Sequence, residues 1–290
     1  MDIETQIASG KLICVFTGRT LQRQGGQLVT ADNHHAYPLL GGNIPQILRD
    51  PPAMHQYTNS NEAMVAEYAP ASLQSFRQKI RHILFNDYRT RASQNAFESL
   101  FAGLDQNALI LSVGGGPSRP HPWLTNLNIE AFENVEIVAD AHVLPYADNS
   151  VDAIYCEAVL EHLSDPGKAV EEMQRVLKPG GNVLATTPFL QAYHGYPHHY
   201  QNFTLAGHEL LFTKRGFIVL QSGSAVGPVN AIVTLMARAC ELYIPGIFGK
   251  ACKRLCQAIT FPFRGLDRLI ENHAERHMLS STTFVLAQKQ

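Results

Sequence analysis

Short apolar runs alternate with helical patterns along the second half of the chain. From Ala108 onward, the runs ALILSV, VEIV, VDAIYC and NVLATT are rich in Val, Ile and Leu. Between the last two runs, apolar residues recur at helical spacing: Ala169, Val170, Met173, Val176 and Leu177. Strands that alternate with helices indicate βαβ units and a buried parallel sheet. The pattern therefore predicts an α/β domain over residues 106–290, with a last strand at Thr283–Ala287.

The helix between the VDAIYC and NVLATT runs has a clear start and stop. Asp165 is a residue type that caps helices, and Pro166 fits the first turn. Lys178, Pro179 and two glycines then end the helical pattern.

The first third of the chain has a different texture. Residues 1–50 contain short β-like runs broken by Gly and Pro and predict a small β-rich appendage. Residues 51–105 read as a polar linker that opens at Pro51-Pro52, followed by a helical region. The apolar positions that suggest this helix are Leu73, Phe76, Ile80, Ile83 and Leu84.

Composition narrows the class of protein. The chain is 45% hydrophobic and 17% charged, which excludes an intrinsically disordered protein, and its net charge of −2 gives no reason to expect nucleic-acid binding. Five scattered cysteines favour a reducing compartment over a disulfide framework. The acidic N-terminus does not resemble a signal peptide, and the apolar stretch Ala225–Ala237 is too short to span a bilayer. We therefore expect a cytoplasmic protein.

A glycine-rich turn follows the first strand of the predicted sheet. Gly114, Gly115 and Gly116 come directly after the ALILSV run. Glycines at such a turn let a ligand approach the backbone closely. A dinucleotide fingerprint would need glycine at position 119, where the chain has Arg119, so the turn does not favour NAD.

A longer pattern is more specific than the glycines. ILSVGGGPS, LTNLNIE and VEIVADAHVLPYADNSVDAIYCEAVLEHLSDPGKAVEEMQRVLKPGGNVLATTPF follow one another in order. Over residues 108–217 the chain resembles the class I methyltransferases of the type 11 kind. The resemblance implies a Rossmann-like, doubly wound, mainly parallel seven-stranded sheet and S-adenosyl-L-methionine as cofactor.

The resemblance also implies positions for the cofactor. Gly114 and Gly116 are expected at its methionine part, and Asp140 with Ala141 at its adenine. Asn128 stands where the family has a ribose-binding acid, and Glu130 is the alternative, since it lies on the same face of an extended chain. Glu157, which follows the fourth strand, completes the set of expected cofactor contacts.

The loop after the fifth strand carries the candidate catalytic residues. Its sequence PFLQAYHGYP is similar to a loop in a subset of the same family that is often encoded among glycan-assembly enzymes. His194 and His199 are candidates for the general base, because histidine has a pKa near neutrality. Tyr193, Tyr196 and Tyr200 offer surface for a sugar or a ring. The alternative interpretation is that the histidines only bond the loop to itself.

A metal is a second alternative on the acceptor side. Glu161-His162 resembles the end of a Glu-x-x-Glu-His cluster found in some methyltransferases, but Ala158 replaces its first glutamate. His194 or His198 would be needed as a further ligand. We assign no metal from the sequence, and the alternative role of these residues is to cap the strand end.

Both ends of the chain raise further expectations. LICVFTGRTL, GGQLVT and AYPLLGGNIPQIL resemble a degenerate zinc ribbon in which Cys14 alone remains of four metal positions, so we expect no zinc there. Residues 226–275 read as a helical insertion that is apolar and basic, and weak contact with a membrane surface is one expectation for it.

The sequence thus favours a methyltransferase for a small-molecule or glycan-type acceptor, with O-methylation expected. Two alternatives are an inactive methyltransferase-like binding or regulatory subunit and a peripheral membrane interaction module.

Overall fold

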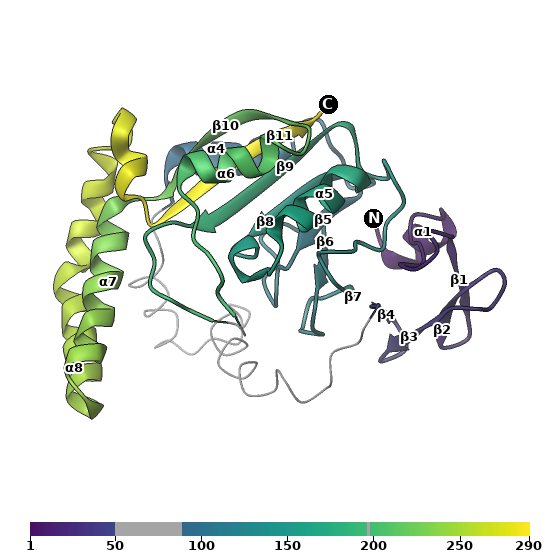
Figure 1. Cartoon of the computed structure of the whole chain (residues 1–290), viewed down its shortest axis with the longest axis horizontal. Coiled ribbons are helices and arrows are strands. Elements are labelled where there is room, and N and C mark those ends of the chain that lie inside the picture. The colour runs from purple at the N-terminus through teal and green to yellow at the C-terminus, as the bar shows by residue number, and fades with distance from the viewer. Residues whose placement is uncertain (50–88, 196–197) are drawn as a thin grey trace.

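The computed structural model describes residues 1–49, 89–195 and 198–290. The predicted helix containing Leu73 and Phe76, and Tyr196 of the acceptor loop, lie outside these residues. Within them, hydrogen-bonded strands form one run in the order β1-β2-β3-β4-β7-β6-β5-β8-β9-β11-β10 (Figure 1).

Seven of these strands form the predicted α/β sheet. Their bounds are β5 (Ile110–Val113), β6 (Leu124–Asn128), β7 (Ile137–Ala139), β8 (Val151–Glu157), β9 (Leu177–Pro188), β10 (Phe217–Val226) and β11 (Thr282–Lys289). The first five pair in parallel, whereas β11 runs antiparallel to both β9 and β10. This is the mixed sheet with a parallel core of the class I methyltransferase fold, so the predicted fold class is confirmed.

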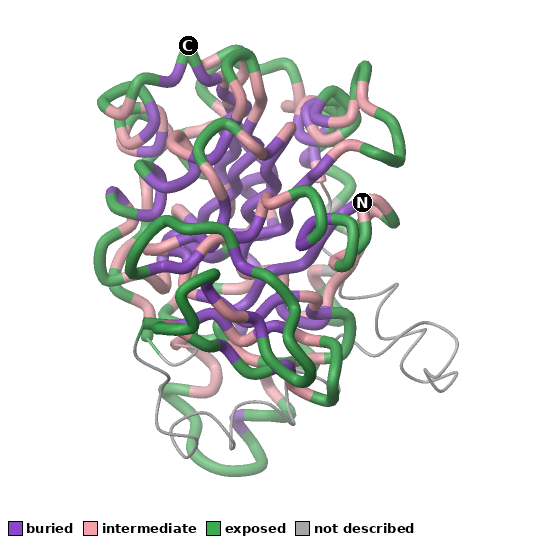
Figure 2. Tube along the Cα trace, turned by 90° about the vertical axis from the view of Figure 1, so that its right-hand side faces the viewer, coloured by how far each residue is buried: buried purple, intermediate pink, exposed green. Residues whose placement is uncertain are grey.

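Helices cover both faces of the sheet because side chains alternate along its strands. On β5, Ile110 packs with residues of α4 (Arg91–Leu100), whereas Leu111 and Val113 pack with α5 (Pro166–Val176) and α6 (Leu205–Thr213) on the other face. Buried stretches consequently run through the middle of the molecule (Figure 2).

The start of α5 is as the sequence predicts. The Asp165 side chain accepts a hydrogen bond from the Lys168 N–H at 3.0 Å, and Pro166 occupies the first turn. The residues of the apolar face, Ala169 to Val176, are buried against the sheet. In contrast, the connection from β5 to β6 contains only turns and bends, as the three prolines in it favour.

The N-terminal segment extends the same sheet. Helix α1 (Ile3–Ala8) is followed by β1 (Leu21–Gln24), β2 (Gln27–Thr30), β3 (Ala36–Leu40) and β4 (Ile44–Ile47), and β4 pairs in parallel with β7. Cys14 is buried with its Sγ 3.2 Å from the Tyr37 hydroxyl. Leu12 and Leu28 share one apolar cluster with Leu111 of β5, so this segment packs into the core of the methyltransferase-like sheet.

A helical hairpin projects from the other end of the sheet. Between β10 and β11 the chain forms α7 (Pro228–Tyr243), α8 (Gly246–Thr260) and the 3-10 helices η2 (Phe261–Arg268) and η3 (Ala274–Leu279). Helices α7 and α8 lie side by side and extend away from the strands (Figure 1). In the part of the chain that the structure describes, no helix combines the length and the apolar character needed to cross a bilayer.

Candidate active site

The glycine turn after β5 can be built only from glycine. Gly114 and Gly116 have φ of 73° and 54°, in the left-handed region that side chains disfavour. A Cβ atom on Gly114 would also lie 2.4 Å from Cγ2 of Val159. Val159 belongs to the segment that follows β8, so the turn and that segment are in direct contact.

A hydrogen bond from a buried asparagine stabilises the conformation of this turn. Nδ2 of Asn126, on β6, donates a 2.7 Å hydrogen bond to the carbonyl of Gly116. A Cβ atom on Gly115 would meet both Oδ1 of Asn126 and Oγ of Ser112 at 2.5 Å. Neither the spacing nor the residue type of Asn126 marks it in the sequence as part of the turn.

The two candidates for the ribose position lie at the end of β6. Asn128 is buried, and its Nδ2 donates to the backbone carbonyl of Glu130 at 3.1 Å. Asn128 is thus bonded to the backbone of Glu130. Oδ1 of Asn128 and the carboxylate of Glu130 are the groups able to accept hydrogen bonds from the hydroxyls of a ribose.

Asp140, which follows β7, has a partner that the sequence did not reveal. Its Oδ1 accepts from the backbone N–H of His142 at 2.9 Å and from the ring Nδ1 at 2.7 Å. Burial alone would raise the pKa of Asp140, but these hydrogen bonds lower it overall. The same bond raises the pKa of His142, and Ala141 between them is buried. The loop expected at the adenine is therefore fixed by its own side chains.

Glu157 ends β8 and is engaged in two contacts. Its carboxylate pairs with Arg89 and accepts from the hydroxyl of Tyr155. Ala158, the next residue, has φ of 53°, which is strained for a residue other than glycine and redirects the chain after the strand.

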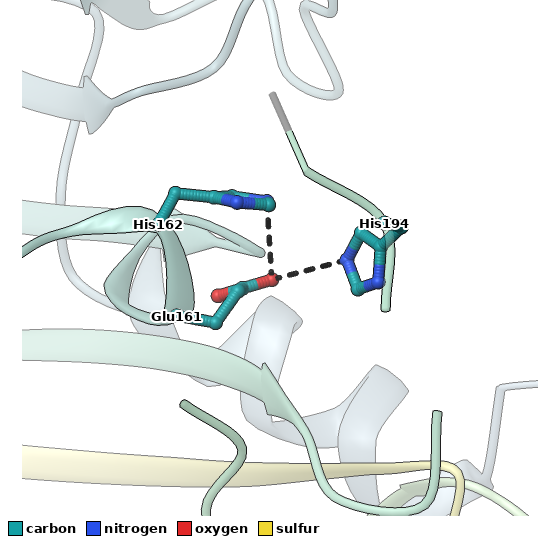
Figure 3. Close-up of side chains that lie close together, drawn as sticks. All are labelled: Glu161, His162 and His194. Atoms are coloured by element: carbon teal, nitrogen blue, oxygen red, sulfur yellow. Dashed lines mark ion pairs between the residues drawn. The ribbon is translucent and has the colours of Figure 1, made fainter. Parts of the chain in front are cut away.

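Glutamate and histidine side chains converge where β8 and β9 end. Glu161 and His162 lie on the short helix η1 (Leu160–His162), and His194 lies in the loop after β9. Nε2 of His162 and Nε2 of His194 are 3.8 and 3.9 Å from Oε1 of Glu161 (Figure 3). We call these three residues the histidine–glutamate centre.

Hydrogen bonds join the segment after β8 to the loop after β9 and fix the position of the histidine–glutamate centre. The backbone N–H of Tyr200 donates to the Glu161 carbonyl at 2.8 Å, and Gln201 donates to the carbonyl of Leu163 at 3.2 Å. Burial lowers the pKa of His162, whereas the Glu161 carboxylate raises that of His194.

His199 differs from His194 because both its ring nitrogens are occupied. Nδ1 accepts from the backbone N–H of His194 at 3.2 Å, and Nε2 donates to Oδ1 of Asn202 at 2.5 Å. Asn202 in turn donates to the carbonyls of Phe189 and Gln191. His199 thus bonds the loop to itself, whereas His194 faces the centre.

The predicted site residues all lie at or just past the carboxyl ends of the parallel strands. The strand order reverses between β5 and β8, and ligands of doubly wound sheets bind at such a switch point. The glycine turn and the histidine–glutamate centre flank this point.

Comparison with known proteins identifies the class of the domain. Residues 111–185 match the family model described as a methyltransferase domain. The ubiquinone/menaquinone biosynthesis C-methyltransferase UbiE of Hahella chejuensis is 38% identical over 81 residues, which are 28% of this chain and 29% of that protein. UbiE of Klebsiella pneumoniae is 41% identical over 80 residues, which are 25% of this chain and 32% of that protein. The chain therefore matches less than a third of the length of these relatives.

Among solved structures, a Haemonchus contortus phosphoethanolamine N-methyltransferase 2 in complex with S-adenosyl-L-methionine aligns with 72% of this chain and 55% of its own. It does so at a TM-score of 0.44 and 17% identity. From the matched domain and the sheet order, the chain carries a class I, S-adenosylmethionine-dependent methyltransferase domain. The methyl donor of this domain is S-adenosyl-L-methionine. The left-handed backbone at Gly114 and Gly116 fits it, because it disfavours side chains in the turn and so lets a ligand approach the backbone closely.

We predict that Gly114→Ala abolishes measurable cofactor binding in calorimetry with S-adenosyl-L-methionine, because the added Cβ overlaps Val159 and forces the turn and the segment after β8 apart. The matched control is Gly180→Ala, which has the same left-handed backbone, with φ of 78°, but open space around it. Val159→Ala combined with Gly114→Ala should restore part of the affinity. Equal affinity in Gly114→Ala and Gly180→Ala would show that the turn does not hold the cofactor.

Proposed function

We propose that the chain methylates a hydroxyl of a small-molecule or glycan-type acceptor, using S-adenosyl-L-methionine. The observation that carries this proposal is the contact between Gly114 and Val159. Val159 packs against the glycine turn Gly114–Gly116, which we call the donor turn. Glu161 follows Val159 by two residues, so the segment that contacts the donor turn also carries part of the histidine–glutamate centre.

The cofactor supplies an electrophilic methyl group on a sulfonium. The acceptor oxygen forms the new bond to the methyl carbon as the carbon–sulfur bond breaks and its electron pair goes to sulfur. A hydroxyl must also lose its proton, and the histidine–glutamate centre is where we place that loss. Its polar groups lie beside the donor turn, and His194 is its most exposed member, with 35% of the side chain accessible.

The remaining residues of the loop position the acceptor. Tyr193 and Tyr200 are 66% and 54% exposed and present aromatic surface in the same loop as His194. His199 and Asn202 hold the loop in shape through the bonds described above. Positioning of this kind can supply much of the rate of a methyl transfer.

We predict that His194→Ala lowers turnover by about 100-fold or more, because proton removal contributes roughly that factor, while the affinity for S-adenosyl-L-methionine stays unchanged. The acceptor is found first by screening nucleotide sugars, glycans and phenolic ring compounds for labelled methyl uptake. His198→Ala is the matched control, since its exposed ring lies in the same loop and contacts Tyr200 in a tilted arrangement. If His194→Ala keeps the turnover of His198→Ala, the loop serves as a lid alone.

A second proposed function is contact with an anionic membrane surface through the α7–α8 hairpin. Leu242, Tyr243, Ile247 and Phe248 are 75%, 87%, 76% and 72% exposed at the turn between the two helices. This turn lies at the end of the hairpin far from the sheet (Figure 1). The hairpin carries four basic side chains and one acidic one, Glu241, which favours anionic lipid over a neutral surface.

We predict that the chain floats with vesicles containing phosphatidylserine. Replacing Ile247 and Phe248 by serine should weaken this binding at least about tenfold, because two apolar side chains no longer enter the lipid. The control replaces Leu210 and Ile218, two apolar residues on the body of the protein that are 50% and 47% exposed, by serine. An equal loss in both double variants, or no flotation of the unchanged chain, rejects the membrane role.

A further inference from the structure

The Glu161 carboxylate is an unusual group to find buried without a hydrogen bond. Its side chain is fully buried, and neither Oε1 nor Oε2 has a hydrogen-bond partner. A buried carboxylate is costly unless hydrogen bonds, a cation or a metal compensates its charge. Among the described residues, Nε2 of His162 and Nε2 of His194 pair with it at 3.8 and 3.9 Å.

Hydrogen bonds to backbone carbonyls define which ring nitrogens of the two histidines carry hydrogen. Nδ1 of His162 lies 2.6 Å from the carbonyl oxygen of His198, and Nδ1 of His194 lies 3.0 Å from that of Ala192. A carbonyl oxygen can only accept, so both Nδ1 atoms donate. In the neutral rings, each Nε2 then carries a lone pair.

Three lone-pair donors therefore face one another. The ligand atoms of Glu161, His162 and His194 all lie within 4.8 Å of one another, and the Nε2 to Oε1 distances of 3.8 and 3.9 Å are too long for hydrogen bonds. They suit a shared ion, because two ligands at roughly 2.1 Å from one metal are at most about 4.2 Å apart.

We propose that the histidine–glutamate centre binds one divalent transition-metal ion. Two imidazoles and one carboxylate are a ligand set of catalytic zinc and of non-haem iron, and they favour such ions over Mg²⁺, which prefers oxygen. The Nδ1–H bonds to backbone carbonyls are the outer contacts that orient metal-binding histidines. His199 is excluded as a ligand because both its nitrogens are engaged.

The role of this ion rests on the proposed function. Three protein ligands leave coordination positions open, and an acceptor hydroxyl bound there would become more acidic. Its proton passes to water, and its oxygen lone pair is then available for the bond to the methyl carbon. With the ion bound, His194 acts as a ligand that holds the centre for the acceptor.

The test uses the untagged full chain after treatment with a chelator. Calorimetric titration with Zn²⁺ and Co²⁺, and with Mg²⁺ for comparison, measures the number of bound ions and their affinity. We expect one Zn²⁺ or Co²⁺ per chain and much weaker binding of Mg²⁺. Glu161→Gln and His194→Gln should each weaken Zn²⁺ binding by more than about 100-fold, since even outer-shell changes cost 10–100-fold.

Two matched controls identify the site. His198→Gln changes an exposed histidine of the same loop, and Cys14→Ser changes the one remaining metal position of the N-terminal segment. Both should keep the affinity of the unchanged chain. If either loses as much affinity as His194→Gln, or if the unchanged chain binds no more tightly than Glu161→Gln, the proposal is wrong.

Thermal unfolding separates loss of metal from loss of fold. The side-chain amide introduced by Glu161→Gln can donate to a histidine Nε2, so the metal-free variant should unfold at or above the Tm of the metal-free unchanged chain. Zn²⁺ should raise the Tm of the unchanged chain and leave that of Glu161→Gln unchanged. Absence of ion binding together with a turnover defect in His194→Ala would reject the ion and leave the proposed function standing. Ion binding without methyl uptake by any acceptor would support the ion site and reject the proposed function.

Discussion

Parallel pairing of β5 with β8 is the constraint on which the site depends. β6 and β7 lie on one side of β5, and the chain then returns to place β8 on the other side. The turns after β5 and β8 consequently meet, and Val159 packs where a side chain on Gly114 would otherwise be. This contact requires glycine in the donor turn and sets the distance from that turn to the histidine–glutamate centre. The same pairing continues to β9, whose loop supplies His194.

Because both faces of the sheet are buried, polar groups gather at the carboxyl ends of its strands. Within the strands, side chains such as Ile110 and Leu111 alternate between two apolar clusters and leave no place for chemistry. Asn126 on β6, and Asp140 and Glu161 past the ends of β7 and β8, hold or face loops instead. Asn126 and Asp140 each make hydrogen bonds that shape those loops, whereas neither carboxylate oxygen of Glu161 makes one. The Glu161 carboxylate is therefore the group at which we propose a bound ion.

Local patterns in the sequence predicted the parts of this structure that local physics determines. The cap at Asp165, the apolar face of α5 and the glycine turn each depend on residues close together in the chain. The bond from Asn126 to Gly116 and the facing of His194 toward Glu161 depend on which strands are neighbours, and no spacing reveals them. His199 and His194 look equivalent in sequence, and only their hydrogen bonds separate them. For the same reason, the continuity of β4 with β7 could not be read from the N-terminal pattern.

The central claim is that donor turn and histidine–glutamate centre form one active site. A crystal structure of the full chain with S-adenosylhomocysteine tests it most directly, because the sulfur marks where the methyl group leaves. The account predicts that the ligand lies over Gly114 and Gly116 with its sulfur directed toward Glu161, His162 and His194. A sulfur directed away from these three residues, or a ligand bound elsewhere on the sheet, would contradict it.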